Sequence, residues 1–261
     1  MSDAVTSGLK DGVLTLTLNK PDKLNALDAP MAKEIYEGLK GADNDPKVRV
    51  IVLTGAGRGF CAGADLVRDR EAEEAGIDES DNLLSWANQT VQVMTTLSKP
   101  IIAAVNGVAA GVGVSYALAA DLVIAAESAS FLLAFSRIGL MPDGGATLWV
   151  AASVGRARAL EMALMAEKIS AAEAKEWGLI TRTAPDGELD AQVHELAAKL
   201  ASGPTRAYAK TKAAINAASV ALLAESLDRE VTGQTELLKS KDNAEGVLAF
   251  REKRPARFTG E

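Results

Sequence analysis

The sequence contains little cysteine, histidine or aromatic side chain. Among its 261 residues there is one cysteine, Cys61, and one histidine, His194, and only 4% of the residues are aromatic. A single cysteine excludes an internal disulfide, and the lack of a Cys/His cluster excludes a structural zinc site. Cys61 has no histidine near it in the sequence, so we expect a small buried hydrophobe. His194 stands alone on an expected amphipathic helix, where we expect a surface role.

The sequence also has no cluster of basic residues. It contains 28 Lys and Arg against 35 Asp and Glu, a formal net charge of -7, and this balance disfavours nucleic acids and anionic membranes as partners. No hydrophobic segment typical of a signal peptide follows Met1, so we expect a cytoplasmic protein. Hydrophobic residues make up 48% of the chain, as in ordinary globular proteins, and the length suffices for one large domain.

Charged side chains are absent from residues 101–120. A membrane span is one interpretation of such a run, but Ala and Gly dominate its second half and Asn106-Gly107 interrupts it. Residues 101–105 are apolar and β-branched, which predicts a short strand buried on both faces. Residues 109–120 are rich in Ala and small residues, which predicts a helix.

Three glycines accompany the passage from this strand into the helix: Gly107, Gly111 and Gly113. Their spacing does not match the G-x-G-x-x-G dinucleotide pattern. They allow another group to approach the helix N-terminus closely, although packing alone would also explain them. Backbone N–H groups at such an end lack intrahelical partners and the helix dipole adds positive charge, so a developing oxyanion can be stabilised there.

The other segments alternate between expected strands and helices. Strands are expected at residues 12–18, 48–54, 121–126 and 131–134, and helices at residues 29–40, 83–97, 147–154, 189–200, 205–218 and 220–238. Asp28 is expected to cap the first helix, and Ser170/Glu173 and Asp242/Glu245 to form capping boxes. Residues 68–81 are crowded with charges and predict a surface loop, either a lid or a solvated linker.

This order of elements predicts an α/β core followed by a helical tail. Strands that alternate with helices favour parallel pairing through right-handed crossovers. The tail has too little apolar mass to stand alone, which favours docking on a neighbouring subunit.

Three motifs follow one another in the sequence: residues 60–66 (FCAGADL), 99–107 (KPIIAAVNG) and 138–145 (IGLMPDGG). Together and in this order they resemble the crotonase superfamily, the enoyl-CoA hydratases and isomerases. The resemblance implies a spiral of ββα repeats over residues 1–200 and a helical trimerisation region over residues 201–261. It also implies an acyl-CoA thioester substrate and a homotrimer or a dimer of trimers. Coenzyme A would be part of the substrate, with no separate cofactor and no metal.

The same resemblance assigns the binding residues. The thioester oxygen would lie between the backbone N–H groups of Ala64 and Val112. Many relatives have Gly at the position of Val112. Valine keeps the backbone amide, but its branched side chain is expected to narrow the acyl pocket or to shift the helix end. The positions similar to coenzyme A contacts are Lys23, Leu24, Ala26, Ala62, Asp65 and Leu66, with Phe250 and Lys253 reaching from an adjacent subunit.

The sequence departs from typical hydratases at both of their glutamates. Alignment through Asn106 and Asp121 puts the two positions on Ser115 and Phe135, and neither side chain can act as the acid or base that hydration needs. Asp143 remains, in a Pro-Asp-Gly sequence that by itself indicates only a turn. In register with the family it matches the working aspartate of some isomerases and of a dehalogenase. Residues 134–136, 155–159 and 176–178 resemble the ring-epoxide and enoyl-CoA isomerases of phenylacetate catabolism.

The hypothesis from the sequence is therefore a one-base isomerase. Asp143 takes the γ-proton of a 3-enoyl-CoA, the two amides hold the dienolate, and the same acid returns the proton at the α-carbon. Apolar neighbours such as Leu140, Met141 and Phe135 would raise the pKa of Asp143 in a dry site. A 2-enoyl-CoA hydratase and a non-catalytic acyl-CoA-binding homologue remain alternatives, and Glu127 is a candidate for a second acid.

Overall fold

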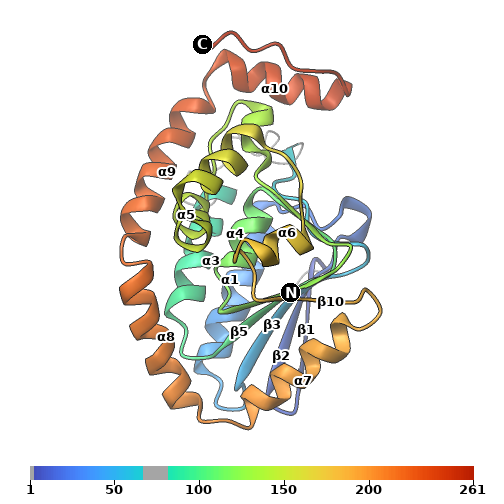
Figure 1. The fold of residues 1–261 in the computed structure, drawn as a ribbon, viewed down its shortest axis with the longest axis vertical. Coiled ribbons are helices and arrows are strands. Elements are labelled where there is room, and N and C mark those ends of the chain that lie inside the picture. Colours follow the sequence, from blue (N-terminus) through green and yellow to red (C-terminus); the bar gives the residue numbers. More distant parts are fainter. Residues whose placement is uncertain (1–2, 67–81) are drawn as a thin grey trace.

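The computed structural model describes residues 3–66 and 82–261. The expected lid or linker at residues 68–81 lies outside the described residues. Two β-sheets occupy the centre of the molecule and helices surround them (Figure 1).

The larger sheet has six strands in the order β1-β2-β3-β5-β7-β10. Its strands are β1 (Val5–Lys10), β2 (Val13–Leu18), β3 (Val50–Gly55), β5 (Ile101–Val105), β7 (Leu122–Ala126) and β10 (Arg182–Ala184). β1 pairs antiparallel with β2, and all other neighbours in this sheet are parallel. The expected parallel sheet is therefore confirmed, while β1 was not predicted.

The smaller sheet has the order β4-β6-β8-β9. Its strands are β4 (Gly59–Cys61), β6 (Val108–Ala110), β8 (Ser130–Leu132) and β9 (Ile169–Ser170). Three consecutive strand pairs, β3/β4, β5/β6 and β7/β8, each give one strand to each sheet, and each pair precedes a helix in the chain. This repetition of two strands and a helix is the expected ββα architecture.

The helices cover the sheets and extend along one side of the molecule. Among the described residues they are α1 (Ala29–Asn44), α3 (Leu83–Thr96), α4 (Val112–Leu118), α5 (Ala146–Met165), α6 (Ala171–Glu176), α7 (Leu189–Ala201), α8 (Thr205–Ser219), α9 (Leu223–Leu237) and α10 (Lys241–Glu252), with the 3-10 helices η1 (Pro21–Lys23) and η3 (Ala134–Ile138). The Asp28 side chain caps α1 by accepting a hydrogen bond from the Met31 N–H, as predicted. The predicted capping box of Ser170 and Glu173 is also present.

β5 lies in the middle of the larger sheet, between β3 and β7. All five of its residues are buried, which confirms a strand covered on both faces. The prediction of one helix over residues 109–120 is wrong at its start. Residues 108–110 form β6 because they pair with β4 and β8, and this pairing overrides the helix propensity of Ala109 and Ala110.

The helical tail packs on the core of its own chain. α9 contacts α3 and α5, and α10 contacts η3. The Asn243 amide donates a hydrogen bond to the Ile138 carbonyl at 2.9 Å, and a Cβ on Gly246 would lie 2.6 Å from the Ile138 Cα. α10 therefore lies directly against η3, and only glycine, which has no Cβ, permits this close approach. Subunit association by the tail stays a prediction.

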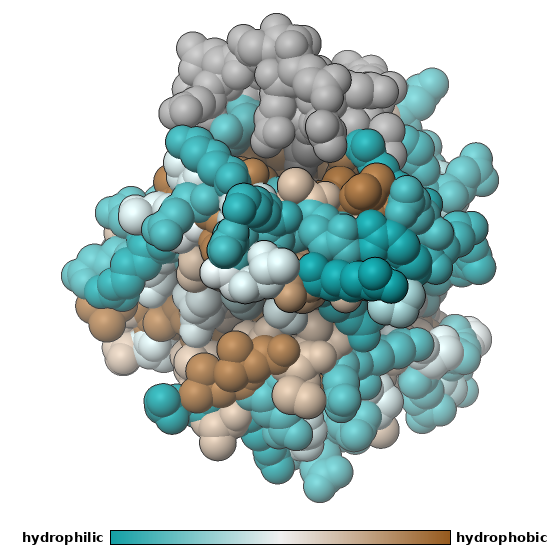
Figure 2. Space-filling view, turned by 90° about the horizontal axis from the view of Figure 1, so that it is seen from above, coloured by the Kyte–Doolittle hydropathy of each residue, from teal (hydrophilic) through white to brown (hydrophobic). Residues whose placement is uncertain are grey.

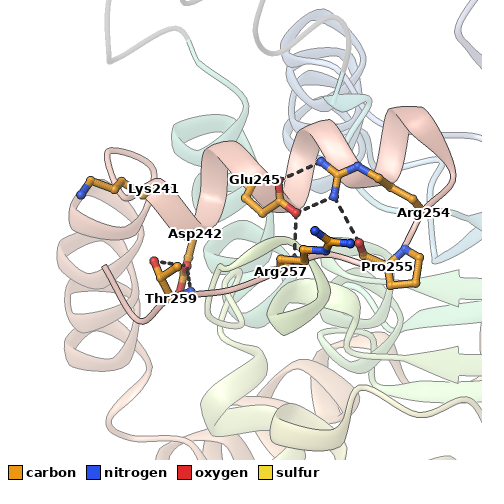
Figure 3. Close-up of a pocket in the computed structure, with 7 residues that line it drawn as sticks. All are labelled: Lys241, Asp242, Glu245, Arg254, Pro255, Arg257 and Thr259. Atoms are coloured by element: carbon orange, nitrogen blue, oxygen red, sulfur yellow. Dashed lines mark hydrogen bonds and ion pairs between the residues drawn. The ribbon is translucent and has the colours of Figure 1, made fainter.

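The capping box predicted at Asp242 and Glu245 is wrong. Ser240 caps α10, because its hydroxyl accepts from the Asn243 N–H. Glu245 instead accepts two hydrogen bonds from the Arg254 guanidinium, at 2.6 and 2.8 Å, and these bonds with one from the Arg257 N–H lower its pKa to about 2. Figure 3 shows that these bonds to Glu245 hold the segment after α10 against this helix.

Large apolar side chains remain exposed on the helical side of the chain. They include Leu160, Leu164, Met165, Ile215, Leu222, Val231, Leu238, Leu248 and Phe250. Figure 2 shows hydrophobic residues gathered in separate groups among hydrophilic ones on the end of the molecule near α10. Among the described residues, no helix has both the length and the hydropathy needed to cross a bilayer.

Candidate active site

Two turns of small residues meet where the sheets approach α4. Gly63 follows β4 with φ +95, and a Cβ at this position would lie 3.0 Å from the Ala110 carbonyl oxygen. Gly111 precedes α4 with φ +53, and its own Cβ would lie 3.7 Å from the Gly63 Cα. Both backbones need glycine here, since the left-handed region is strained for other residues. The contact brings together the turns that carry Ala64 and Val112.

The N–H groups of Ala64 and Val112 are available for a ligand. Within residues 3–66 and 82–261, the Ala64 N–H donates to no protein acceptor. In the β-bridge between Leu27 and Ala64, the Leu27 N–H donates to the Gly63 carbonyl and the Asp65 N–H donates to the Leu27 carbonyl. Val112 opens α4, so its N–H has no carbonyl one turn earlier in the helix. The two predicted donors therefore lie on neighbouring turns, and no acceptor for either N–H is found among the described residues.

The loop that carries Asp143 lies against the same helix end. A Cβ on Gly144 would lie 2.9 Å from the Ser115 Cβ and 3.6 Å from the Val112 Cγ2. The buried Ser115 hydroxyl donates a hydrogen bond to the Asp143 carbonyl at 2.7 Å. The predicted base and the predicted donor Val112 are thus parts of one site, and Ser115 supports the loop.

Phe135 forms an apolar wall of this site. Only 8% of its surface is exposed, and its Cζ lies 3.7 Å from the position of a Cβ on Gly111. An aromatic ring at this point excludes water from the turn before α4. Both side chains at the expected glutamate positions, Ser115 and Phe135, therefore flank the site without supplying an acid or base.

Two buried polar residues of α9 complete the site, and the sequence analysis did not identify them. The Gln234 Nε2 donates a hydrogen bond to the Asp143 Oδ2 at 2.8 Å. Glu230 accepts from the Gly145 N–H at 2.6 Å and from the Thr147 N–H at 3.0 Å, and also from the Thr147 hydroxyl. Burial raises the pKa of Glu230, while these hydrogen bonds oppose the shift.

A sequence signal for these residues existed. The buried face of α9 is formed by Leu223, Ser226, Leu227, Glu230 and Gln234. Its spacing is that of an apolar stripe, so the last two members are polar residues at positions where apolar ones are expected. Polar residues within a buried stripe are informative because each must find a partner.

Of the other titratable residues considered, Cys61 and Tyr116 are buried, and His194 and Glu127 are exposed. Cys61 is fully buried, as expected, and burial raises the pKa of its thiol to about 12. Burial also raises the pKa of Tyr116, and the nearby Asp143 carboxylate adds to the shift. His194 is exposed on α7, as expected. Glu127 is exposed just after β7, and its N–H donates to the Ala184 carbonyl.

The predicted coenzyme A contacts from the first part of the chain lie side by side. The Ala62 N–H donates to the Leu24 carbonyl at 2.9 Å, and Lys23 forms an ion pair with Asp65 at 2.6 Å. Ala26 and Leu66 are half-buried in the same two segments. A surface groove of about 540 Å³ adjoins Lys23. The two segments that carry the six predicted residues are therefore bonded to each other, and Ala64 lies in the second segment.

Phe250 and Lys253 lie elsewhere, at the end of α10. Phe250 is 65% exposed and Lys253 is exposed as well. In the described part of the chain, no hydrogen bond or ion pair connects either residue to the surface around Lys23. Their predicted role requires an adjacent subunit and stays a prediction.

The sequence and the fold both match known proteins. Residues 8–261 match the family model described as enoyl-CoA hydratase/isomerase. Over all of both chains, the sequence is 43% identical to 1,2-epoxyphenylacetyl-CoA isomerase and 35% identical to 2,3-dehydroadipyl-CoA hydratase, both from Escherichia coli. A crystal structure of an enoyl-CoA hydratase from Mycobacterium avium subsp. paratuberculosis matches with a TM-score of 0.90 and 46% identity over 98% of each chain. The chain therefore belongs to the enoyl-CoA hydratase/isomerase family, the crotonase superfamily.

Proposed function

We propose that this protein shifts the double bond of an unsaturated acyl-CoA, from 3-enoyl to 2-enoyl or in a related ring isomerisation, with Asp143 as the only acid-base group. The observation that carries the proposal is the position of Asp143. Its backbone carbonyl accepts a hydrogen bond from Ser115, and the following Gly144 lies beside Val112. The family resemblance puts the positions of the two hydratase glutamates on Ser115 and Phe135. One carboxylate is sufficient for a proton shuttle, whereas hydration needs a second group to activate water.

The chemistry corrects the proton order of the sequence hypothesis. In a 3-enoyl thioester the α-hydrogens lie between the carbonyl and the double bond, so they are the acidic ones. Asp143 therefore takes the α-proton, and the electron pair of the broken C–H bond enters a dienolate with its negative charge on the thioester oxygen. The protonated acid then returns the proton to the γ-carbon, which leaves a 2-enoyl thioester and an ionised carboxylate.

The amides of Ala64 and Val112 are proposed to hold the oxyanion of that dienolate. Preorganised donors in a site without water stabilise such a charge more than water does, because they need no reorganisation during the reaction. Burial of Phe135 and Val112 supports a dry site.

The coenzyme A moiety is proposed to bind along the adjoining surface formed by Lys23, Leu24, Ala26, Ala62, Asp65 and Leu66. Ala64 lies between Ala62 and Asp65, which are bonded to Leu24 and Lys23, so a carrier bound here would be next to the proposed oxyanion donor.

A second candidate is 2-enoyl-CoA hydratase, favoured by the names of the relatives from Escherichia coli and Mycobacterium avium. A third is a homologue that binds acyl-CoA without turning it over. The discriminating experiment is to incubate the protein with 3-enoyl-CoA and with 2-enoyl-CoA and to identify the products by mass and absorbance. We expect conversion between the two enoyl thioesters with no change in mass. A dominant product heavier by one water would support the hydratase, and unchanged substrates would support the binding protein.

We also propose that the protein forms a homotrimer or a dimer of trimers. Large apolar side chains are exposed on α5, α8, α9 and α10, and exposed apolar groups that gather on one side of a molecule often mark subunit interfaces. Static light scattering at micromolar concentration is expected to give the mass of three or six chains. A monomer under these conditions would contradict this proposal and the intersubunit role of Phe250 and Lys253.

A further inference from the structure

We propose that Gln234 is a positioning residue that orients the Asp143 carboxylate for proton transfer, and that Glu230 fixes the loop on which Asp143 lies. This inference rests on the role of Asp143 in the proposed function. It assigns part of the site to α9, a helix that lies far from the family motifs in the sequence.

The first argument is the contact between the two side chains. The Gln234 Nε2 lies 2.8 Å from the Asp143 Oδ2, and only 3% of Gln234 is exposed. A hydrogen bond to a charged acceptor in a place without water is stronger than one at the surface. It therefore restricts rotation of a short carboxylate whose own loop continues into Gly144 and Gly145, both with positive φ.

The second argument is that α9 holds this loop on both sides of Asp143. After Asp143, Glu230 accepts from the N–H groups of Gly145 and Thr147. Before it, Met141 lies against α9 so closely that a Cβ on Gly233 would be 2.2 Å from the Met141 sulfur. Residues 230, 233 and 234 share one face of the helix, so one rigid element sets the place of the carboxylate.

The third argument is chemical. A one-base isomerase must cycle between an ionised and a protonated carboxyl group, and an amide can bond to both forms. The Gln234 N–H donates to the carboxylate. Its Oε1 is buried without a hydrogen-bond partner among the described residues, so after rotation of the amide it can accept from the protonated acid. A lysine here would favour only the ionised form, and a carboxylate would repel it.

Few other titratable groups face Asp143 in the described part of the chain. Glu230 faces its loop from α9, and Tyr116 faces it from α4 with Cys61 of β4 nearby. Burial raises the pKa of Tyr116 and of Cys61, so both stay neutral at pH 5 to 8. A change in the acidic limb of the rate profile therefore reports on the carboxyl groups.

The test compares pH profiles of kcat/KM for the parent, Gln234→Met and Gln234→Glu. Gln234→Met keeps the volume but removes the donor, so the acidic limb should move upward by about one pH unit and kcat should fall by about tenfold with little change in KM. Gln234→Glu keeps the shape but brings a second carboxyl group, so its acidic limb should move further. A purely structural role of Gln234 would not make the acidic limb move further in Gln234→Glu than in Gln234→Met.

The matched control is Gln192→Met on α7. Gln192 also donates to a carboxylate, the Glu188 Oε2 at 3.2 Å, but on the surface. The pH profile of kcat/KM for Gln192→Met should equal that of the parent. The inference would be overturned, and the proposed function kept, if both Gln234 variants had the pH profile of the parent while Asp143→Asn was inactive. Thermal unfolding would confirm that these variants are folded. Full activity in Asp143→Asn would instead overturn the proposed function.

Discussion

Asp143→Asn is expected to lower kcat/KM for double-bond isomerisation by ~100-fold or more, because loss of a general base has effects of this size. Asparagine has nearly the same shape, and its side-chain oxygen can still accept the hydrogen bond that Gln234 now donates to the Asp143 Oδ2. The Ser115 bond to the backbone carbonyl at residue 143 is also independent of the side chain. The loop should therefore keep its conformation and lose only its proton carrier.

The measurement is kcat/KM with 3-enoyl-CoA, together with calorimetric binding of a saturated acyl-CoA that cannot react. Binding should change little while turnover falls. Asp228→Asn is the matched control, since Asp228 is exposed on α9 and should be replaceable without effect. Activity of Asp143→Asn within a few-fold of the parent would refute the one-base mechanism, and Glu127 would be the next acid to replace.

Val112→Pro is expected to lower kcat by about 10²- to 10³-fold, the usual effect of removing one oxyanion donor. Proline has no N–H but suits the first position of a helix, which Val112 occupies in α4. The preceding Gly111, at φ 53 and ψ -127, has the mirror image of the extended conformation that residues before proline prefer. The substitution should therefore remove the donor while the helix end keeps its geometry.

The matched control is Val112→Ala, which keeps the N–H and removes only the branched side chain. The ratio of kcat between the alanine and proline variants isolates the amide from the loss of packing against Gly144. Circular dichroism and thermal unfolding check that both variants fold. Equal kcat values in the two variants would mean that the Val112 amide does not hold the oxyanion.

Much of the fold followed from local sequence patterns. β5 consists of five buried apolar residues after a proline, and Asp28 precedes a helix that it caps. Such elements are predictable because their signals lie within a few residues. The three motifs that carry the family resemblance also contain the proposed site residues Ala64 and Asp143. Of these, Ala64 follows the end of β4, the kind of position where ligands of α/β proteins bind.

Tertiary structure decided what local signals could not. Ala109 and Ala110 became a strand because two neighbouring strands were in place to pair with them. Glu245 left its expected capping role because Arg254, nine positions later, bonds to its carboxylate.

By itself, then, the sequence predicted the parallel sheet and, through its family resemblance, the ββα core, the family and Asp143 as the proposed base. It could not determine that Glu230 and Gln234 serve that carboxylate. A polar side chain at a position of an apolar stripe indicates burial with some partner, but the local pattern does not say which partner it has. Only the packing of α9 against the Asp143 loop placed these two residues inside, where burial makes their hydrogen bonds consequential.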